Sequence, residues 1–291
     1  DGMNKTMMKS GDDNTLLVMR QGSTTELQSV MFPMEVKILA NHPAIKRTKD
    51  DQPIYAAELF VNAEYKTGNR VNEASLSLRG ISQHTYQFRP NFQLTSGALF
   101  THGLREIIIG EAIARKFPDL QVGKVITLGN SQWTISGIFS DNNSVFESEI
   151  WADLSVVQND YQRGNTIQSV RLALKSNTDL AALKSEWHAD PRLNVRAMME
   201  KEFFAEQGEN LTKLIRWIGF PVAFIMAIGA VVSALNTMYA VIASRSQEIA
   251  THKAIGFSPF AISISVVIEA ILLALLGALI GIVPIYVLFD G

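Results

Sequence analysis

Residues Trp217–Ser244 form a run of 28 positions without a charged side chain. An α-helix rises about 1.5 Å per residue, so about 20 residues cross the hydrocarbon layer of a bilayer. The run exceeds this length, and core helices of soluble proteins seldom stay uncharged for so long. A second apolar run, from about Pro259 to Phe289, contains a single charge at Glu269. The sequence therefore predicts two membrane-spanning helices, at about residues 215–243 and 259–289.

Charge divides the chain into two regions. Residues 1–213 hold all but six of the 26 Lys and Arg and 28 Asp and Glu residues. The six charged residues of the second region are Arg216, Arg245, Glu248, Lys253, Glu269 and Asp290. The first region has the composition of a globular domain and the second that of a membrane protein. We therefore expect a folded domain at 1–213 and a membrane region at 214–291. We also expect the chain to be a piece of a longer protein.

Composition and motifs exclude several classes of function. The net charge of −2 excludes the basic surface of a nucleic-acid-binding protein, so no nucleic-acid partner is expected. The absence of cysteine excludes disulfides and thiolate metal sites, and the five histidines are too scattered for a zinc site. The sequence contains no GxxxxGK[ST], HExxH or GxSxG motif. We therefore expect no enzyme activity, metal or cofactor in this chain.

The pattern of residues 1–213 is typical of an α+β fold, because strands and helices mix without regular alternation. The predicted strands are Leu16–Arg20, Glu58–Tyr65, Ala74–Leu78, Glu106–Ile109, Val125–Leu128, Trp133–Phe139 and Val170–Leu174. The predicted helices are Glu111–Phe117, Leu180–His188 and Ala197–Thr212. Gly129-Asn130 predicts a hairpin turn between two of the strands. The aromatic and acidic stretch Phe139–Trp151 is interpreted as a loop packing onto its own domain, in preference to a ligand site.

Residues 245–258, which we call the elbow, connect the two predicted spans. Ser246–Ile255 is predicted as a short helix with Ile249 on one face. Gly256 suits the position after a helix end, where the backbone is left-handed. Ser258 and Pro259 are typical of a helix start, as N-cap and first helical residue. This pattern predicts a rigid, structured elbow suited to docking a partner at the membrane surface.

Glu269 is the one charge of the second span, where a carboxylate is costly and faces protein or water. It has two interpretations, a structural hydrogen bond to a neighbouring helix and a role in transport. The orientation of the spans stays open from charge alone. Arg245 and Lys253 in the elbow oppose Lys201, Lys213 and Arg216 on the other side, which is too even for the positive-inside rule.

Several of these stretches resemble one family. RSQEIATHKAIGFSP (245–259), followed by an apolar segment with an early Glu, is similar to the permease domain of MacB/FtsX-type ABC transporters. Upstream, REIIIGEAIARKF (105–117), VGKVITLG (122–129) and QWTISGIF (132–139) resemble that family's periplasmic core domain. LSLRGIS (76–82) also fits the approach to that core. Family permeases have four spans, so the resemblance implies that the first and last membrane helices lie outside this sequence.

The resemblance implies a function that composition does not supply. It implies an α+β extracytoplasmic domain, two transmembrane helices and a cytoplasmic elbow, in a multi-pass protein of the bacterial inner membrane. The elbow would contact a separate ABC ATPase subunit that binds the ATP. The elbow residues carried over or assigned to this contact are Arg245, Glu248, Ile249, Lys253, Ala254 and Gly256. Further implied partners are the lipid bilayer, a second permease copy or paralogue, and a periplasmic adaptor.

The leading hypothesis is thus a permease subunit that couples ATP hydrolysis to movements of a periplasmic domain, for export, extrusion or lipoprotein release. The alternative is a two-span receptor or regulator with a periplasmic sensing domain. A receptor would continue from a span into a signalling region, whereas this chain returns at once through a short elbow. A membrane-anchored hydrolase is disfavoured because no nucleophile and base pattern is present.

Overall fold

The computed structural model describes residues 15–66 and 73–289 and divides the chain into two compact units, Asp1–Lys213 and Leu214–Gly291. The first unit is a mixed α/β domain built on a ten-stranded sheet, and two long apolar helices follow it. The predicted α+β class with two long helices is confirmed. The neighbouring aspartates Asp12 and Asp13 lie among polar residues, which indicates a solvated loop in preference to a catalytic pair, and they lie outside the described residues.

The described strands are β1 (Thr15–Arg20), β2 (Tyr55–Lys66), β3 (Glu73–Ile81), β4 (Gln93–Gly97), β5 (Glu106–Gly110), β6 (Val125–Leu128), β7 (Ser131–Ser140), β8 (Glu149–Asp153), β9 (Ser169–Ala173) and β10 (Val195–Met199). The described helices of the first unit are α2 (Pro33–Ala40), α3 (Glu111–Lys116), α4 (Leu154–Asp160) and α5 (Leu180–Ala189), with short 3₁₀ helices η1 (Glu26–Gln28), η2 (Thr85–Phe88) and η3 (Val145–Ser148). The chain continues in α6 (Glu200–Ser244), α7 (Ser246–Ala254) and α8 (Pro259–Phe289).

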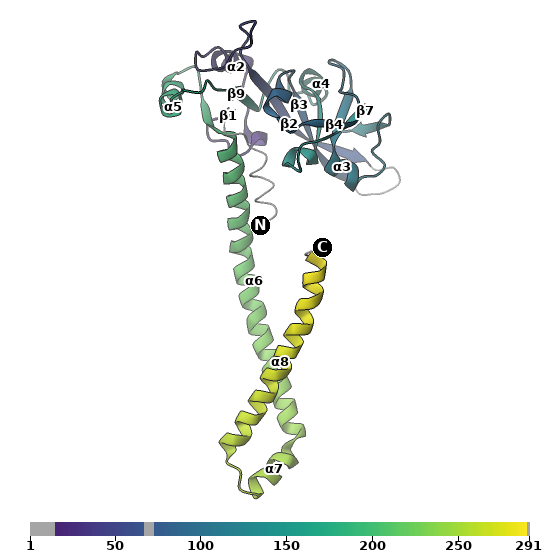
Figure 1. The fold of residues 1–291 in the computed structure, drawn as a ribbon, viewed down its shortest axis with the longest axis vertical. Coiled ribbons are helices and arrows are strands. Elements are labelled where there is room, and N and C mark those ends of the chain that lie inside the picture. The colour runs from purple at the N-terminus through teal and green to yellow at the C-terminus, as the bar shows by residue number, and fades with distance from the viewer. Residues whose placement is uncertain (1–14, 67–72, 290–291) are drawn as a thin grey trace. The chain divides into compact units, whose positions relative to one another are not determined.

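The strands lie in the order β10-β1-β9-β2-β3-β8-β5-β7-β4. β6 pairs with β7 as the predicted hairpin and also with β2, through Tyr65 and Leu128, so half of the sheet closes on itself. Figure 1 shows α2 and α5 at the β1 and β9 end and α3 and α4 at the β7 end. The closed half encloses one apolar core, which includes Leu78, Trp133 and Ile135, and α2 and α5 cover a second core over β1 and β9.

The opposite face of the sheet combines aromatic packing with buried charge. Side chains alternate along a strand, so Leu78 and its neighbour Arg79 point to opposite faces, as do Val170 and Arg171. Phe139, Phe146 and Trp151 form a third apolar core on this side, with Phe203 and Phe204 of α6. Beside it lies a group that we call the ionic cluster. Its members are Glu26, Glu58, Arg79, Arg89, Glu149, Arg171 and Glu200, all buried.

Some predicted boundaries are wrong. Residues 197–199 belong to strand β10, which pairs with β1 from Leu16–Met199 to Arg20–Val195, and not to a helix. Helix α6 begins at Glu200 and continues through Pro221, so the predicted helix at 197–212 and the predicted span at 215–243 form one helix. The stretch Phe139–Trp151 packs onto its own domain as interpreted. It includes the 3₁₀ helix η3 and most of strand β8, however, and is not simply a loop.

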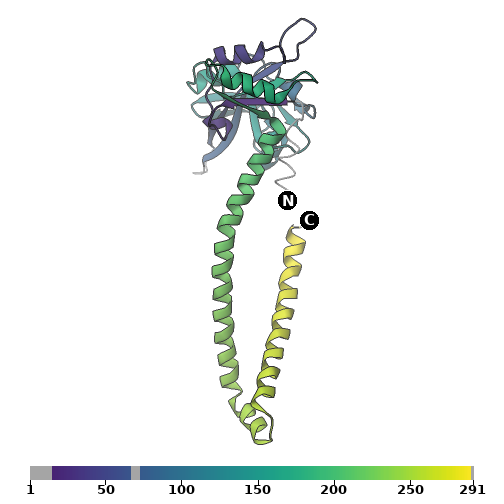
Figure 2. The same cartoon turned by 90° about the vertical axis from the view of Figure 1, so that its left-hand side faces the viewer.

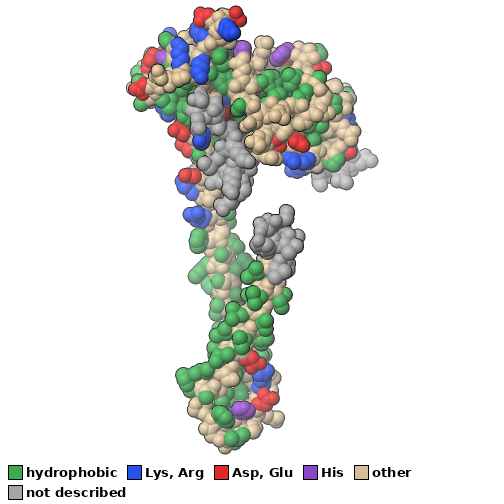
Figure 3. Space-filling model, viewed as in Figure 1, with side chains coloured by type: hydrophobic (Ala, Val, Ile, Leu, Met, Phe, Trp, Pro, Cys, Tyr) green, Lys and Arg blue, Asp and Glu red, His purple; other side chains and the backbone are tan. Residues whose placement is uncertain are grey.

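The second unit is a helical hairpin. The C-terminal part of α6 and helix α8 are joined by α7, and both long helices are long and apolar enough to cross a membrane (Figure 2). In Figure 3, hydrophobic side chains cover most of α8 and the C-terminal part of α6, whereas charged side chains lie along the start of α6 and near the elbow. None of the most apolar 18-residue window of either helix is buried within the chain. Exposed apolar surface of this extent is unfavourable in water, which supports the predicted membrane location.

Candidate functional site

The elbow between α6 and α8 is the candidate site, and its ends are built as the sequence predicts. Phe257 N donates to His252 O and Gly256 N donates to Lys253 O, both at 3.1 Å. This pair of bonds is the Schellman arrangement, which satisfies the last carbonyls of a helix. Gly256 has φ of +102°, a left-handed conformation that residues with a Cβ rarely adopt. The end of α7 is thus fixed by backbone geometry that requires glycine.

The start of α8 is fixed by a side-chain cap. Ser258 Oγ accepts from Ala261 N at 3.2 Å, and Pro259 is the first helical residue. Such a cap satisfies one of the free N–H groups of a helix start. Only three residues, Ile255 to Phe257, separate the end of α7 from this cap. The short helix α7 is therefore held between two defined ends and is not a flexible connection.

Arg245 and Glu269 form a two-pronged ion pair across the elbow. Arg245 Nη1 donates to Glu269 Oε2 at 2.8 Å, and Nη2 donates to Oε1 at 3.1 Å. Arg245 directly precedes α7, while Glu269 lies ten residues into α8. The long arginine side chain therefore reaches along the apolar surface to a carboxylate inside the second span. Of the two interpretations of Glu269, the structure supplies a geometry for the structural bond.

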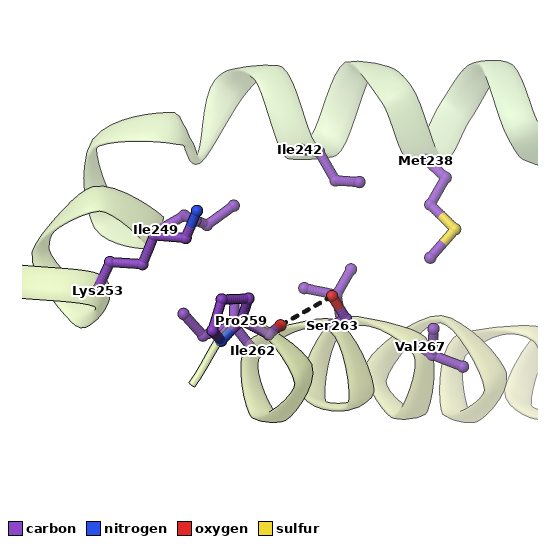
Figure 4. Close-up of a pocket in the computed structure, with 9 residues that line it drawn as sticks. Met238, Ile242, Ile249, Lys253, Pro259, Ile262, Ser263 and Val267 are labelled. Atoms are coloured by element: carbon purple, nitrogen blue, oxygen red, sulfur yellow. Dashed lines mark hydrogen bonds between the residues drawn. The ribbon is translucent and has the colours of Figure 1, made fainter. Parts of the chain in front are cut away.

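A partly open apolar cavity of about 290 Å³ lies between α6, α7 and α8. Its lining residues are Met238, Ile242, Ile249, Lys253, Pro259, Ile262, Ser263, Val266 and Val267. Figure 4 shows Met238 and Ile242 of α6 facing Ser263 and Val267 of α8. A smaller neighbouring cavity of about 130 Å³ is lined on its polar side by Arg245, Glu248, His252 and Glu269. Ile249 borders both cavities, so this residue of α7 lies at the centre of the elbow.

The structure brings most of the predicted elbow residues together. Arg245 contacts Glu269 directly, Ile249 and Lys253 line one cavity, and Glu248 joins Arg245 around the other. Ala254 and Gly256 lie at the end of α7 and line neither cavity. Glu248, Lys253, Ala254 and Gly256 are exposed, whereas Ile249 is half-buried. The elbow therefore carries charge on its exposed surface and around the smaller cavity, whereas the larger cavity is mainly apolar.

Sequence reasoning missed two features in and beside the elbow. Phe257 and Phe260 are large apolar side chains that are 56% and 75% exposed within the chain. Phe257 lies between the predicted helix end at Gly256 and the predicted helix start at Ser258, and Phe260 lies in the first turn of α8. These positions next to the predicted helix ends are the signal that could have identified them. Met238 and Ile242 line the larger cavity from α6, and helical spacing alone could not select them from the many apolar residues of the span.

In the first unit, one polar cavity of about 450 Å³ lies next to His102, Asp153 and Ser155. His102 Nδ1 and Asp153 Oδ2 are 2.7 Å apart, while Ser155 Oγ donates to the other oxygen of the same carboxylate. Burial would raise the pKa of Asp153, but hydrogen bonds from Ser155 and His102 lower it below its usual range. Because the serine points to the carboxylate and not to the imidazole, this trio does not form a nucleophile–base pair. Asp153 instead caps α4.

The described residues contain no group of three or more His, Cys, Asp or Glu side chains placed to hold a metal ion. The prediction of a cofactor-free chain, with ATP held by a partner, stays a prediction.

Comparisons with known proteins decide the family. A family model described as the MacB-like periplasmic core domain matches residues 1–189. The chain belongs to this family. A second model, described as the FtsX-like permease C-terminal region, matches residues 221–290, which include the elbow. The resemblance to MacB/FtsX-type permeases that the sequence motifs indicate is therefore confirmed.

Curated relatives agree with this family. The macrolide export ATP-binding/permease protein MacB of Escherichia coli is 25% identical over 231 residues, which cover 74% of this chain and 35% of the relative. The probable export ATP-binding/permease protein MacB of Pseudomonas entomophila (strain L48) is 20% identical over 229 residues, which cover 72% of this chain and 34% of that protein. The chain thus spans about a third of the length of these relatives.

Among solved structures, the periplasmic region of MacB from Actinobacillus actinomycetemcomitans is similar with a TM-score of 0.51 and 14% identity. The similarity covers 72% of this chain and 95% of that one. At this identity the similarity shows a shared fold of the first unit.

Proposed function

We propose that this MacB-like chain is the permease part of an ABC transporter, and that its elbow receives movement from a separate ATPase subunit. The structure of the elbow is the observation that supports this proposal. It is a short helix with defined ends between two candidate membrane spans, within the region that matches the FtsX-like permease model. A short helix held at both ends can transmit a displacement caused by a partner, because it moves as one rigid body with the helices that flank it.

The names of the relatives combine an ATP-binding part and a permease part. We infer by analogy that ATP is bound and hydrolysed by a partner subunit and that this chain binds no cofactor. Two permease chains, either two copies or two paralogues, would pair with two ATPase subunits. A periplasmic adaptor is a further proposed partner. The process served would be export, extrusion or lipoprotein release. The comparisons favour this function over the two-span receptor.

The proposed location is the bacterial inner membrane, with the first unit in the periplasm and the elbow in the cytoplasm. Two spans place the domain and the far end of α8 on the same side of the membrane. Because the sequence contains no cysteine, a single introduced thiol reports its own location. Asn130 in the β6–β7 turn and Ser246 in the elbow are both exposed positions for this purpose.

The topology experiment uses Asn130→Cys and Ser246→Cys in separate chains with a membrane-impermeant thiol reagent. Asn130→Cys should react in intact cells, and Ser246→Cys only after the membrane is permeabilised. The reverse pattern would overturn the orientation and the proposed ATPase contact. Reaction of both in intact cells would contradict the two-span arrangement.

The coupling experiment compares elbow variants in the complex with the ATPase subunit. Glu248→Lys reverses an exposed charge, and Gly256→Val forces a β-branched residue into a left-handed conformation. Both should weaken ATPase association or uncouple ATP hydrolysis from export. Gln247→Lys adds charge at the neighbouring exposed position, and Gly164→Val imposes the same backbone strain in a loop of the first unit, with φ of +58° and open space around it.

Both control variants should keep association and export near the wild-type level. If Glu248→Lys and Gly256→Val also leave both unchanged, the elbow is not the contact that transmits movement.

A further inference from the structure

The ionic cluster of the first unit links adjacent strands of the sheet through arginine side chains. Arg79 on β3 donates through Nε and Nη2 to both oxygens of Glu149 on β8, each at 2.7 Å. Its Nη1 also donates to Glu58 Oε2 on β2 at 2.8 Å, and its two terminal nitrogens donate to Glu26 of η1 at 2.9 and 3.0 Å. The guanidinium of Arg79, 2% exposed, therefore joins β2, β3 and β8 to η1.

The cluster continues to the first residue of α6. Arg171 on β9 donates through Nη1 to Glu58 Oε2 at 2.5 Å and through Nε to Glu200 Oε1 at 2.6 Å. Arg89 Nη1 donates to the same Glu200 oxygen at 3.1 Å. Glu200 opens the helix that leads into the first candidate span. A continuous series of hydrogen-bonded ion pairs thus runs from Glu200 through Arg171, Glu58 and Arg79 to Glu149.

Aromatic side chains shield the cluster from water on the side that faces α6. The guanidinium carbon of Arg89 lies 3.8 Å from the ring centroid of Phe146, and the guanidinium carbons of Arg79 and Arg171 lie 5.6 and 5.9 Å from it. Phe146 in turn contacts Phe204 of α6 edge-to-face, with centroids 5.7 Å apart. The start of α6 is therefore held by one carboxylate and by aromatic contacts in the next turn.

Among the carboxylates of the cluster, Glu26 is held in its ionised form. Burial would raise the pKa of Glu26, but the charges of Arg79 and Arg171 outweigh it and hold this pKa well below the usual range of a glutamate. A buried ion pair fixes direction as well as distance, because charged hydrogen bonds weaken quickly when bent. Apolar contacts, such as those of Phe203 and Phe204, have no fixed direction and allow the packed surfaces to slide past each other. Two arginines on one oxygen of Glu200 therefore set the position of the helix start against the sheet.

We propose that Glu200 is a positioning residue that ties the start of α6 to the sheet, so that displacement of α6 moves strands β9 and β3 through Arg171 and Arg79. This inference rests on the proposed function, since it names the residues by which movement would reach the periplasmic domain. The competing role is general stabilisation of the domain, which any buried ion pair of the cluster would share.

The first experiment measures hydrogen–deuterium exchange of the full chain in lipid nanodiscs. Glu200→Gln keeps the shape of the side chain and removes its charge. Exchange in the first turn of α6 and in β9 should become about tenfold faster or more, as expected when a buried charge pair is broken. The β6–β7 hairpin, whose strand pairings include no member of the cluster, reports general stability and should keep its wild-type rate.

The matched control is Glu206→Gln. Glu206 also lies on α6 and pairs with a strand, through Arg196 Nη2 of β10 at 3.0 Å, but its side chain is 53% exposed. Exposed ion pairs contribute little to stability, so Glu206→Gln should change the exchange rates of α6 and β9 less than about twofold. Glu200→Asp keeps the charge on a shorter side chain and should fall between wild type and Glu200→Gln. It also supplies the comparison if the glutamine variant does not fold.

The second experiment measures the same exchange in the complex with the ATPase subunit, with and without ATP. In the wild type, ATP should change exchange in β9 and β3. Glu200→Gln should lose this change while ATPase association and the hairpin rate stay as in the wild type. A general stabilising role would not remove the ATP response alone. If Glu200→Gln keeps the response, or if its exchange matches that of Glu206→Gln, the inference is overturned.

Failure of the proposed function would give a different result. In that case the wild-type complex would not form or would show no response to ATP. The tie between Glu200 and the sheet would then be judged by the nanodisc comparison of Glu200→Gln with Glu206→Gln, which requires no partner.

Discussion

The two units of the chain use arginine and glutamate in opposite ways. In the first unit, three arginines and four glutamates share a buried cluster in which Arg79 contacts Glu26, Glu58 and Glu149. In the second unit, Arg245 and Glu269 form one isolated pair, with side chains 47% and 48% exposed within the chain. The cluster is a shared network, whereas the pair depends on a single partner for each charge.

This difference follows from what surrounds each group. The cluster is closed by protein, so every lost charge leaves several buried partners without compensation. The pair lies on the surface of a helical hairpin, where lipid provides no hydrogen bonds to a carboxylate but a headgroup or water at the interface can reach an arginine. We therefore expect loss of Arg79, which joins Glu26, Glu58 and Glu149 at the centre of the cluster, to destabilise the domain as a whole, and damage to the pair to stay local to the elbow.

The largest expected effect is that of Arg79→Met, which keeps an unbranched side chain but leaves three buried carboxylates short of a counter-charge. Breaking a buried network of this kind costs about 3–5 kcal/mol, which is a large part of the stability of a domain. Urea unfolding followed by the fluorescence of the buried Trp133 and Trp151 measures the loss. Arg192→Met removes an arginine that is 69% exposed from its pair with Asp190, and it should have a much smaller effect.

Equal unfolding midpoints for Arg79→Met and Arg192→Met would show that the cluster is no more important to the domain than a surface pair, and the comparison of the two units would fail.

The second prediction concerns the pair in the elbow. Glu269→Arg and Arg245→Glu each place two like charges together and should lower export severalfold, because the start of α7 is no longer held against α8. The double variant Arg245→Glu with Glu269→Arg restores opposite charges and should regain most of the activity. Membrane abundance of each variant, measured by immunoblot, separates loss of coupling from loss of the protein.

No recovery in the double variant would mean that each residue acts by itself. Glu269 would then be a candidate for a direct role in transport, which is its other interpretation.

Sequence reasoning predicts those parts of the structure that local chemistry decides. The alternation of Trp133–Phe139 and the Gly129-Asn130 turn predict the β6–β7 hairpin, since both lie in one short segment. In the same way, Gly256 and Ser258 predict the ends of α7 and α8, because a left-handed residue and an N-cap act within a few positions. The strand β10 was missed because it forms by pairing with β1, which is nearly 180 residues earlier in the chain.

The ionic cluster was missed for a related reason. In a half-buried strand, polar residues between apolar ones indicate the solvent-facing side, and Arg79 and Arg171 both occupy such positions. Here that side is covered by η1, Phe146 and the start of α6, which come from distant parts of the sequence. A pattern within one strand cannot show what covers its other face. The pairing of Arg245 with Glu269 is easier to infer from the sequence, because both residues are isolated charges in or beside apolar runs.

The third prediction uses the pH dependence of unfolding to distinguish the contribution of the cluster from that of the rest of the domain. The folded-state pKa of Glu26 is held below its usual value, so its contribution to stability is full above about pH 4.3, the ordinary pKa of a glutamate. This contribution is lost as the pH falls from there toward the lowered pKa, because the unfolded chain then binds more protons. Glu26→Gln has no such group and should lack that part of the pH dependence.

Unfolding midpoints of wild type and Glu26→Gln, measured from pH 7 to pH 2, should therefore differ most at neutral pH and approach each other in acid. A constant difference across this range would show that the charge of Glu26 does not matter to the cluster.

The smallest expected effect compares helix caps in the two units. Asp179 caps α5 by accepting from Ala181 N at 2.9 Å and from Ala182 N at 3.1 Å, and Ser258 caps α8 through Ala261 N. Replacing such a cap by alanine costs about 1 kcal/mol. Asp179→Ala should therefore lower the unfolding free energy of the domain by about this amount. Ser258→Ala should leave the domain unfolding curve unchanged and speed amide exchange only at Phe260–Ile262, because the caps belong to different units. If Ser258→Ala destabilises the domain as much as Asp179→Ala does, the two units do not unfold independently, and damage at the elbow is not local.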